Sequence, residues 1–291
     1  METTYTVFSQ AYGTVDNRLE NFLGDAVQNA IAEMAGPMRV ALVLYVLLYG
    51  FAILRGAIQE PLMDFAVRSI KLTIIYLLAT TPAYGDYVTQ PLFHQLPDAL
   101  SRALGGAAFQ DAGGAFDRYI GQTAWLADRI TEDAEIWDVM DWLIATAVWI
   151  CGALAAALGF GIVTVAKVAL ALIVALGPIF IGLSLFEATR RYFFGWLSQA
   201  VNYLVLFALI FAVFQLVLAM VADQWESLQA QDAMAAGFAF IALSLLGSIF
   251  FLQTPTLAAG IAGGASLGIA DFLNAGRSDI VFSQRRKGGR K

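Results

Sequence analysis

The stretch WLIATAVWICGALAAALGFGIVTV, residues 142–165, decides the fold class, because it runs for 24 residues without a charged side chain. A membrane-spanning helix needs about 20 mostly apolar residues, so this stretch predicts a transmembrane helix. The whole chain agrees, since 59% of its 291 residues are hydrophobic, 14% are charged and the mean hydropathy is +0.69. Soluble domains are roughly 45–50% apolar and about 25% charged. We therefore expect an all-α fold, a polytopic transmembrane helical bundle.

Two further spans precede this stretch. We place the first at 38–54 and the second at about 70–80, with a start nearer Pro61 because the run is short. Residues 1–34 instead repeat apolar side chains every three or four positions, which indicates an amphipathic helix that Gly36-Pro37 should end. No apolar core of a secretory signal lies there, so we expect an uncleaved first span. The predicted units are an amphipathic periplasmic helix over 1–37 and two transmembrane helices over 38–80.

The segment 81–141 is polar and acidic, with ten Asp and Glu residues against three Arg residues. We expect it to be periplasmic and to contact proteins rather than nucleic acid, because carboxylates repel phosphate. Its second half repeats apolar residues at spacings of four and three, which indicates a helix with one apolar face. That face could pair with another helix, or lie on its own domain or on the membrane surface. Its residues are Phe116, Ile120, Thr123, Ala127, Ile130, Ala134 and Trp137.

The predicted transmembrane core covers 142–252, and a Gly-rich, basic cytoplasmic tail follows over 253–291. The spans of this core after the first are expected at 196–222 and 233–252.

Gly177-Pro178 interrupts the remaining apolar run of the core, 168–186. Proline removes an i→i−4 hydrogen bond, and irregular backbone at membrane depth is tolerated only where protein or water covers it. The interruption predicts a broken helix. Lys167, just before the run, could line a pathway or could snorkel to the cytoplasmic headgroups.

The positions of Lys and Arg predict the orientation, because basic residues gather on the cytoplasmic side. If 168–186 enters the membrane, turns at Gly177-Pro178 and returns, twelve of the 17 bases face the cytoplasm. We therefore expect about five spans plus a broken, re-entrant helix and a periplasmic helical region. The N-terminus is predicted to be periplasmic and the C-terminus cytoplasmic. Six full spans are the alternative.

Small residues in the stretch 142–165 form two faces narrow enough for close helix packing, within the chain or between subunits. One face holds Gly152, Ala156 and Gly159, and the other holds Ala153, Ala157 and Gly161. Further along, Glu187 could pair with Arg190 and Arg191 on one helix face. These residues could contact anionic lipid or a cytoplasmic partner, or simply orient the segment.

No pattern of a catalytic site is present. The sequence has no phosphate-binding loop, no Cys/His metal spacing and no nucleophile elbow. We interpret the sole histidine, His94, as a solvated loop residue, and the glycines of 260–264 as a flexible exit from the last span. The chain is therefore predicted not to be an enzyme and to bind neither a cofactor nor a metal.

The residues VALALIVALGPIFIGLSLFEATRRYFFGWLSQAVNYLV, 168–205, combine an apolar run into Gly177-Pro178 with a later Phe, a basic pair and a Trp. These later residues are Phe186, Arg190, Arg191 and Trp196. In this pattern the chain resembles the TrbL family, the polytopic inner-membrane subunits of conjugal transfer and type IV secretion systems, equivalent to the sixth protein of the VirB set. The sequence PTLAAGIAGGAS, beginning at Pro255, is similar to the family's C-terminal pattern. The resemblance covers about residues 140–266.

The resemblance implies a channel or assembly-platform subunit of the bacterial inner membrane that supports pilus biogenesis and the translocation of DNA or protein. It implies no enzymatic activity. The implied partners are the other inner-membrane and scaffold subunits, pilin and minor pilin, membrane lipids, and DNA in transient contact. It also implies a homo-oligomeric ring of five subunits.

Two other classes of function are weaker. A secondary transporter with a midplane site at the broken helix would suit a discontinuous helix. However, we find no inverted repeat between 38–80 and 142–252. A membrane enzyme is weaker still, because no acid, base and nucleophile converge.

Overall fold

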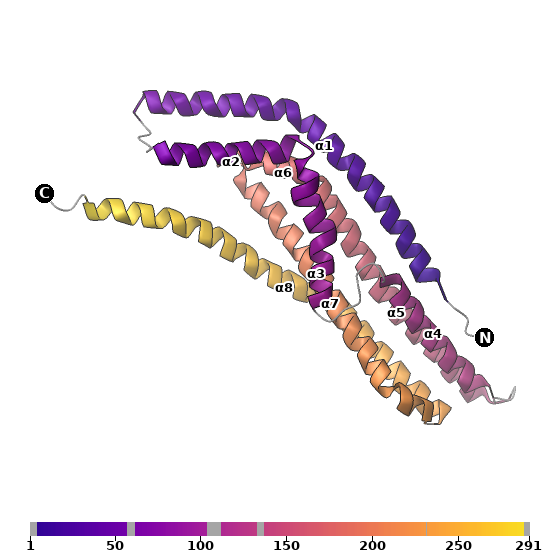
Figure 1. Ribbon diagram of the computed structural model, residues 1–291. Coiled ribbons are helices and arrows are strands. Elements are labelled where there is room, and N and C mark those ends of the chain that lie inside the picture. The colour runs from indigo at the N-terminus through magenta and orange to yellow at the C-terminus, as the bar shows by residue number, and fades with distance from the viewer. Residues whose placement is uncertain (1–4, 57–61, 104–111, 133–136, 231, 288–291) are drawn as a thin grey trace.

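In the computed structural model the chain is helical throughout the residues that the structure describes, which are 5–56, 62–103, 112–132, 137–230 and 232–287. This confirms the predicted all-α fold class (Figure 1). The helices are α1 (Val7–Leu54), α2 (Leu62–Thr80), the π-helical η1 (Gly85–Gln95), α3 (Leu96–Ala103), α4 (Ala112–Thr131), α5 (Val139–Ala175), α6 (Gly177–Leu183), α7 (Arg190–Ala230) and α8 (Ala233–Lys287).

Four of the described helices are long and apolar enough to cross a membrane. They are α1, α5, the part of α7 from Arg190 to Val217, and the part of α8 from Ala233 to Ile261. The predicted polytopic membrane bundle is therefore confirmed. α2 is not among the four, because it carries Asp64, Arg68 and Lys71 within 19 residues. The number of spans stays a prediction.

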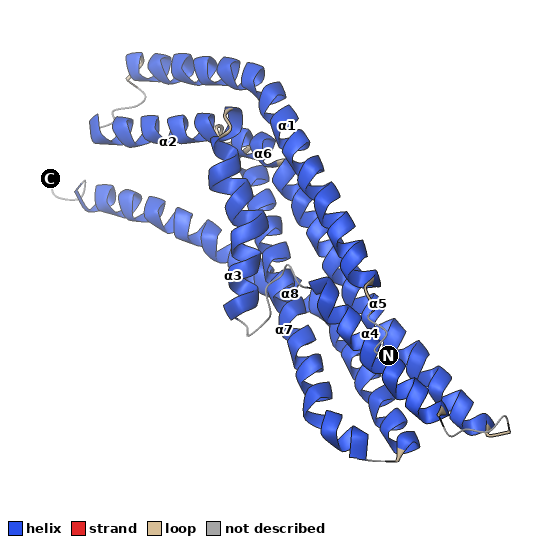
Figure 2. Ribbon diagram, turned by 45° about the vertical axis from the view of Figure 1, so that its right-hand side comes forward, coloured by secondary structure: helices blue, strands red, loops and turns tan. Residues whose placement is uncertain are grey.

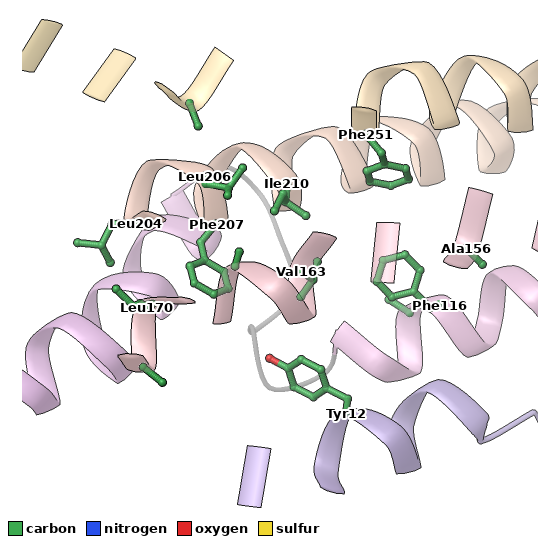
Figure 3. Packing of buried hydrophobic residues seen from close by; sticks show 14 of the residues in the cluster. Tyr12, Phe116, Ala156, Val163, Leu170, Leu204, Leu206, Phe207, Ile210 and Phe251 are labelled. Atoms are coloured by element: carbon green, nitrogen blue, oxygen red, sulfur yellow. The ribbon is translucent and has the colours of Figure 1, made fainter. Parts of the chain in front are cut away.

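α5 is the central helix. α4, α7 and α8 pack along it, and the first half of α1 lies beside it (Figure 2). Ala156, Val163 and Leu170 of α5 lie among buried side chains that α1, α4, α7 and α8 contribute (Figure 3). One helix therefore connects segments that are far apart in the sequence.

Three helical arms extend from this bundle toward one side: the second half of α1, α2, and the C-terminal part of α8 (Figures 1 and 2). The α1 arm ends at Leu54 and is followed by Arg55 and Gly56. Gly56 has a positive φ of 68°, a backbone conformation that suits glycine. In α1, only 6% of the most apolar window is buried by the rest of the chain, against 39–44% in the other three candidate spans. The α1 arm is thus the least covered apolar surface of the four.

The prediction that Gly36-Pro37 ends a helix is wrong, because α1 continues through Pro37 to Leu54. A proline removes one helical hydrogen bond, which neighbouring packing can outweigh. Here Met38, the residue after Pro37, is 2% exposed. The Met34 side chain lies so close to Gly182 of α6 that a Cβ on Gly182 would overlap it. Figure 1 shows α1 bending between two straight arms instead of ending.

The break at Gly177-Pro178 is present, but the expected hairpin within 168–186 is not. α5 runs without interruption through Lys167 to Ala175, and α6 follows after Leu176. The segment that returns along α5 is α7, which begins at Arg190. The hairpin prediction failed because it placed Lys167 at the cytoplasmic end of a span, whereas the structure buries Lys167 inside α5.

The apolar face predicted in the segment 81–141 packs within the chain. Its first five residues are all buried on α4, against α5 and α8: Phe116, Ile120, Thr123, Ala127 and Ile130. Ala134 lies outside the described residues, and Trp137 is 85% exposed. Of the alternatives left open by the sequence, helix pairing inside the bundle is the one observed.

Candidate functional site

The break between α5 and α6 is built around the missing N–H of Pro178. In an unbroken helix residue 178 would donate to the carbonyl of Val174, which proline cannot do. The hydroxyl of Tyr84 donates to that carbonyl instead, at 2.5 Å. Burial raises the pKa of Tyr84, so its hydroxyl keeps the proton that it donates. A side chain 90 residues earlier in the chain therefore replaces the lost helical bond.

The neighbouring carbonyl is also occupied from outside the helix. Trp196 Nε1 on α7 donates to the carbonyl of Ile173 at 2.7 Å, and the Trp196 ring stacks on Phe180 of α6 at 6.4 Å. Gly177 allows the close approach of Tyr84, because a Cβ at this position would overlap the tyrosine hydroxyl. Gly177, Pro178 and Trp196 thus meet at one junction, together with Tyr84.

Lys167 forms a second centre on the same helix. It is 4% exposed, forms an ion pair with Asp16 of α1, and donates to the Tyr12 hydroxyl at 3.3 Å. Its ammonium nitrogen also lies 4.7 Å from the Tyr12 ring centre and 5.8 Å from that of Phe93 in η1. The predicted snorkelling lysine is therefore wrong, because partners within the chain balance its charge in the interior.

Two other carboxylates, those of Glu20 in α1 and Asp98 in α3, also attract the charge of Lys167. Tyr12, Asp16 and Glu20 recur every four residues, so they share one face of α1. This polar stripe is the sequence signal from which a buried charged site could have been predicted, and the prediction was not made. Charged groups inside a membrane bundle are costly, and they are functional candidates when they are paired with one another.

A third cluster fixes the start of α1. Asp117 of α4, 6% exposed, accepts hydrogen bonds from the backbone N–H groups of Phe8 and Ser9, both at 2.9 Å, and from the Ser9 hydroxyl. A Cβ on Gly113 would overlap the Ser9 backbone. Orphan N–H groups at a helix start need such an acceptor. Asp117 therefore caps α1 across more than 100 residues of sequence.

The two lines of small residues in α5 differ in their surroundings. A Cβ on Gly152 would overlap Thr123 of α4, and one on Gly159 would overlap Phe116 and Phe251, while Ala156 is 1% exposed. On the second line Ala157 is exposed, and a Cβ on Gly161 would meet no other atom within 4 Å. The first line serves packing inside the chain, and the second is left open.

The remaining motif residues lie apart from the junction. The Phe186 ring is 6.2 Å from that of Tyr45, and Arg190 and Arg191 are exposed at the start of α7. Glu187 precedes α7, so it does not share a helix face with the two arginines as predicted.

Pro255 lies inside α8, which continues through it. His94 is half-buried in η1, edge-on to Phe93 at 5.0 Å, and is not the solvated loop residue that we predicted.

Long apolar helices that cover a broken helix and an internal ion pair define a polytopic α-helical membrane protein. Residues 42–254 match the family described as "TrbL/VirB6 plasmid conjugal transfer protein". The chain therefore belongs to the TrbL/VirB6 family, and is a multi-pass inner-membrane subunit of a type IV secretion system. This family is one of structural secretion subunits and is not a known enzyme family.

Curated relatives extend the match to the whole chain. The "Type IV secretion system protein VirB6" of Bartonella quintana is 24% identical over 99% of this chain and 89% of its own length. The protein of the same description from Bartonella henselae has the same identity and coverage. The "Protein VirB6" of Agrobacterium fabrum is 25% identical over 71% of this chain and 68% of its own length.

Proposed function

We propose that the chain is a channel or assembly-platform subunit that supports pilus biogenesis and the translocation of DNA or protein across the inner membrane. Its family and its similarity to VirB6 proteins support a place in a type IV secretion system. The partners we propose are the other inner-membrane and scaffold subunits, pilin, minor pilin and transiently DNA, with five copies of the chain in a ring.

The junction at Gly177-Pro178 carries this proposal. Three segments, the chain before η1, α5 and α7, meet there through the hydrogen bonds to Val174 and Ile173. Irregular backbone in a membrane persists where protein covers it, and here Tyr84 and Trp196 cover the bend between α5 and α6. A fixed bend of this kind suits a subunit that shapes an assembly, because packed cores are not continuously deformable.

The experiment is complementation of a strain that lacks the gene, with Pro178→Ala in place of the native chain. We expect transfer of a mobilisable plasmid or a reporter substrate to fall while the amount of membrane-inserted protein stays normal. Gly161→Ala is the control, because its added Cβ meets no atom. Native transfer with Pro178→Ala at normal protein levels would refute the role of the junction.

We also propose that the acidic segment 81–141 contacts proteins in the periplasm, and that DNA contacts other parts of the chain. The ten acids against three bases support this. Photocrosslinkers at Asp86 and Asp128, both exposed, should capture protein partners. Recovery of translocating DNA mainly from these positions would contradict the proposal.

A secondary transporter is the second candidate, and the buried pair of Lys167 and Asp16 favours it, because transporters place charged groups inside the bundle. Transporters with broken helices also use the carbonyls at the break as ligands. Here Tyr84 and Trp196 already occupy the carbonyls of Val174 and Ile173. The junction therefore supports a platform better than a transport site.

A further inference from the structure

An aromatic stack on the α1–α2 hairpin holds an arginine. The rings of Tyr45 and Tyr49 stack at 6.2 Å with an interplanar angle of 10°, and Phe65 of α2 extends the stack at 6.4 Å from Tyr49. The guanidinium carbon of Arg68 lies 4.6 Å from the Tyr49 ring centre, and Arg68 Nη1 donates to the Tyr45 hydroxyl at 3.3 Å. The cation is thereby fixed on one face of the hairpin.

The segment after α6 carries two more arginines, and the guanidinium of Arg191 lies 4.9 Å from the ring centre of Tyr192 and donates to its hydroxyl at 2.9 Å. Phe186 contacts Tyr45, with ring centres 6.2 Å apart, and the backbone N–H of Arg190 donates to the Phe186 carbonyl at 3.0 Å. Arg190 and Arg191 are both exposed. We call Arg68, Arg190 and Arg191, together with Tyr45 and Tyr49, the basic corner.

The basic corner is positive in a chain that is negative as a whole. The segments 55–71 and 187–191 carry five Lys and Arg residues against three Asp and Glu residues, whereas the formal charge of the chain is −6. An anion is therefore attracted to this corner more than to the acidic remainder of the surface.

Apolar side chains surround these charges. Val43 is 61% exposed, Leu47 65%, Phe51 55% and Phe65 50%. Nucleic acid or an acidic peptide could pair with the arginines but has no hydrocarbon part to lie against these side chains. A phospholipid suits both the arginines and the apolar side chains, because one molecule joins a phosphate to acyl chains.

We propose that the basic corner binds the phosphate of an anionic phospholipid, with the acyl chains along the exposed face of the α1–α2 hairpin. Arginine presents a planar set of donors that matches phosphate oxygens, and tyrosine favours the boundary between headgroups and hydrocarbon. Basic pockets between membrane helices bind acidic headgroups in this way. The inference does not depend on the secretion role, because it concerns the isolated chain and its bilayer.

The test uses the full chain, purified in detergent and mixed with phosphatidylglycerol or phosphatidylcholine, with bound lipid counted by native mass spectrometry. We expect the native chain to retain phosphatidylglycerol in preference to phosphatidylcholine. Each basic residue near a membrane surface changes binding of anionic lipid by about fivefold, so Arg190→Gln with Arg191→Gln should reduce the preference on the order of tenfold or more. Arg68→Lys keeps the charge but removes the planar donor set, and should reduce the preference less.

Arg118→Gln is the matched control, since Arg118 is an exposed arginine on α4, away from the corner. The double variant changes only exposed side chains, so its fold should be preserved, which circular dichroism would verify. Equal retention of the two lipids by the native chain overturns the proposal. An unchanged preference in the double variant, or an equal loss with Arg118→Gln, also overturns it.

Discussion

Tyr84 and Pro178 act as a pair at the scale of single residues, since the tyrosine supplies the donor that the proline lacks. Tyr84→Phe should leave the buried carbonyl of Val174 unpaired, which costs about 1–3 kcal/mol. We expect a lower thermal unfolding midpoint in detergent. Tyr87→Phe, at a residue of η1 that is 75% exposed, should leave the midpoint unchanged. Equal midpoints for the two variants would mean that the hydroxyl of Tyr84 contributes nothing.

Lys167 and Asp16 form a buried ion pair, whose contribution to the free energy of unfolding can be measured. Lys167→Met would leave Asp16 facing an apolar side chain, and removing one partner of such a pair costs about 3 kcal/mol, near the low end because Asp16 remains 29% exposed. Lys167→Met combined with Asp16→Asn should recover much of the loss, because both charges are then absent. Unfolding by titration with dodecyl sulfate measures both free energies.

Lys71→Met is the control for this series, since Lys71 is exposed on α2. A double variant as unstable as Lys167→Met alone would show that the pairing of the two charges is not the reason for the loss.

At the scale of elements, the contact between α4 and α5 depends on the absence of side chains at Gly152 and Gly159. Gly152→Ala should push α4 away through Thr123, and overpacking of this kind costs about 1–3 kcal/mol. Gly161→Ala on the same helix should instead be neutral or stabilise the helix by about 0.5–1 kcal/mol, because alanine is the better helix former. Thermal unfolding of the two variants in parallel tests this difference. A Gly152→Ala variant as stable as Gly161→Ala would exclude close packing at this position.

The start of α1 depends on Asp117 in a similar way. Asp117→Ala removes the acceptor for two backbone N–H groups, a loss worth about 1–2 kcal/mol for a helix cap. Amide hydrogens near residue 8 should then exchange roughly 5–30-fold faster in a deuterium experiment. Asp128→Ala, at an exposed acid on the same α4, should leave the exchange unchanged. If the two variants exchange alike, α1 is held by its apolar contacts alone.

Periodicity predicted a helix well where one of its faces is apolar. It predicted less well where contacts with residues far away in the sequence determine the structure. The apolar face of α4 was predicted from its spacing because the five residues at that spacing are apolar or small. The continuation of α5 through Lys167 could not be predicted from local sequence, since Asp16 is about 150 residues away. The Tyr84 contact is similar, because nothing around residue 84 identifies Val174 as its acceptor.

At the scale of the whole molecule, the course of α5 and α7 bears on the orientation. With a re-entrant hairpin within 168–186, the charge rule required the chain to turn back at Pro178. In the structure α5 has 37 residues, which corresponds to about 55 Å at ~1.5 Å per residue, so it can cross a hydrocarbon core of about 30 Å by itself. α7 then returns along α5, and Arg190 and Arg191 are its first two residues. The two arginines keep their predicted side without any re-entrant segment.

The resulting prediction is a periplasmic N-terminus and a cytoplasmic C-terminus, with α1, α2, α5, α7 and α8 as the crossing helices. Lys167 no longer counts among the cytoplasmic bases, because it is paired with Asp16. The prediction therefore depends on Arg55, Arg190, Arg191 and the basic tail. An alkaline phosphatase fusion at residue 291 should be inactive, and one at Asp138, in the predicted periplasmic segment, should be active. An active fusion at residue 291 would require an even total number of crossings, so that α2 or α8 would lie along the membrane surface.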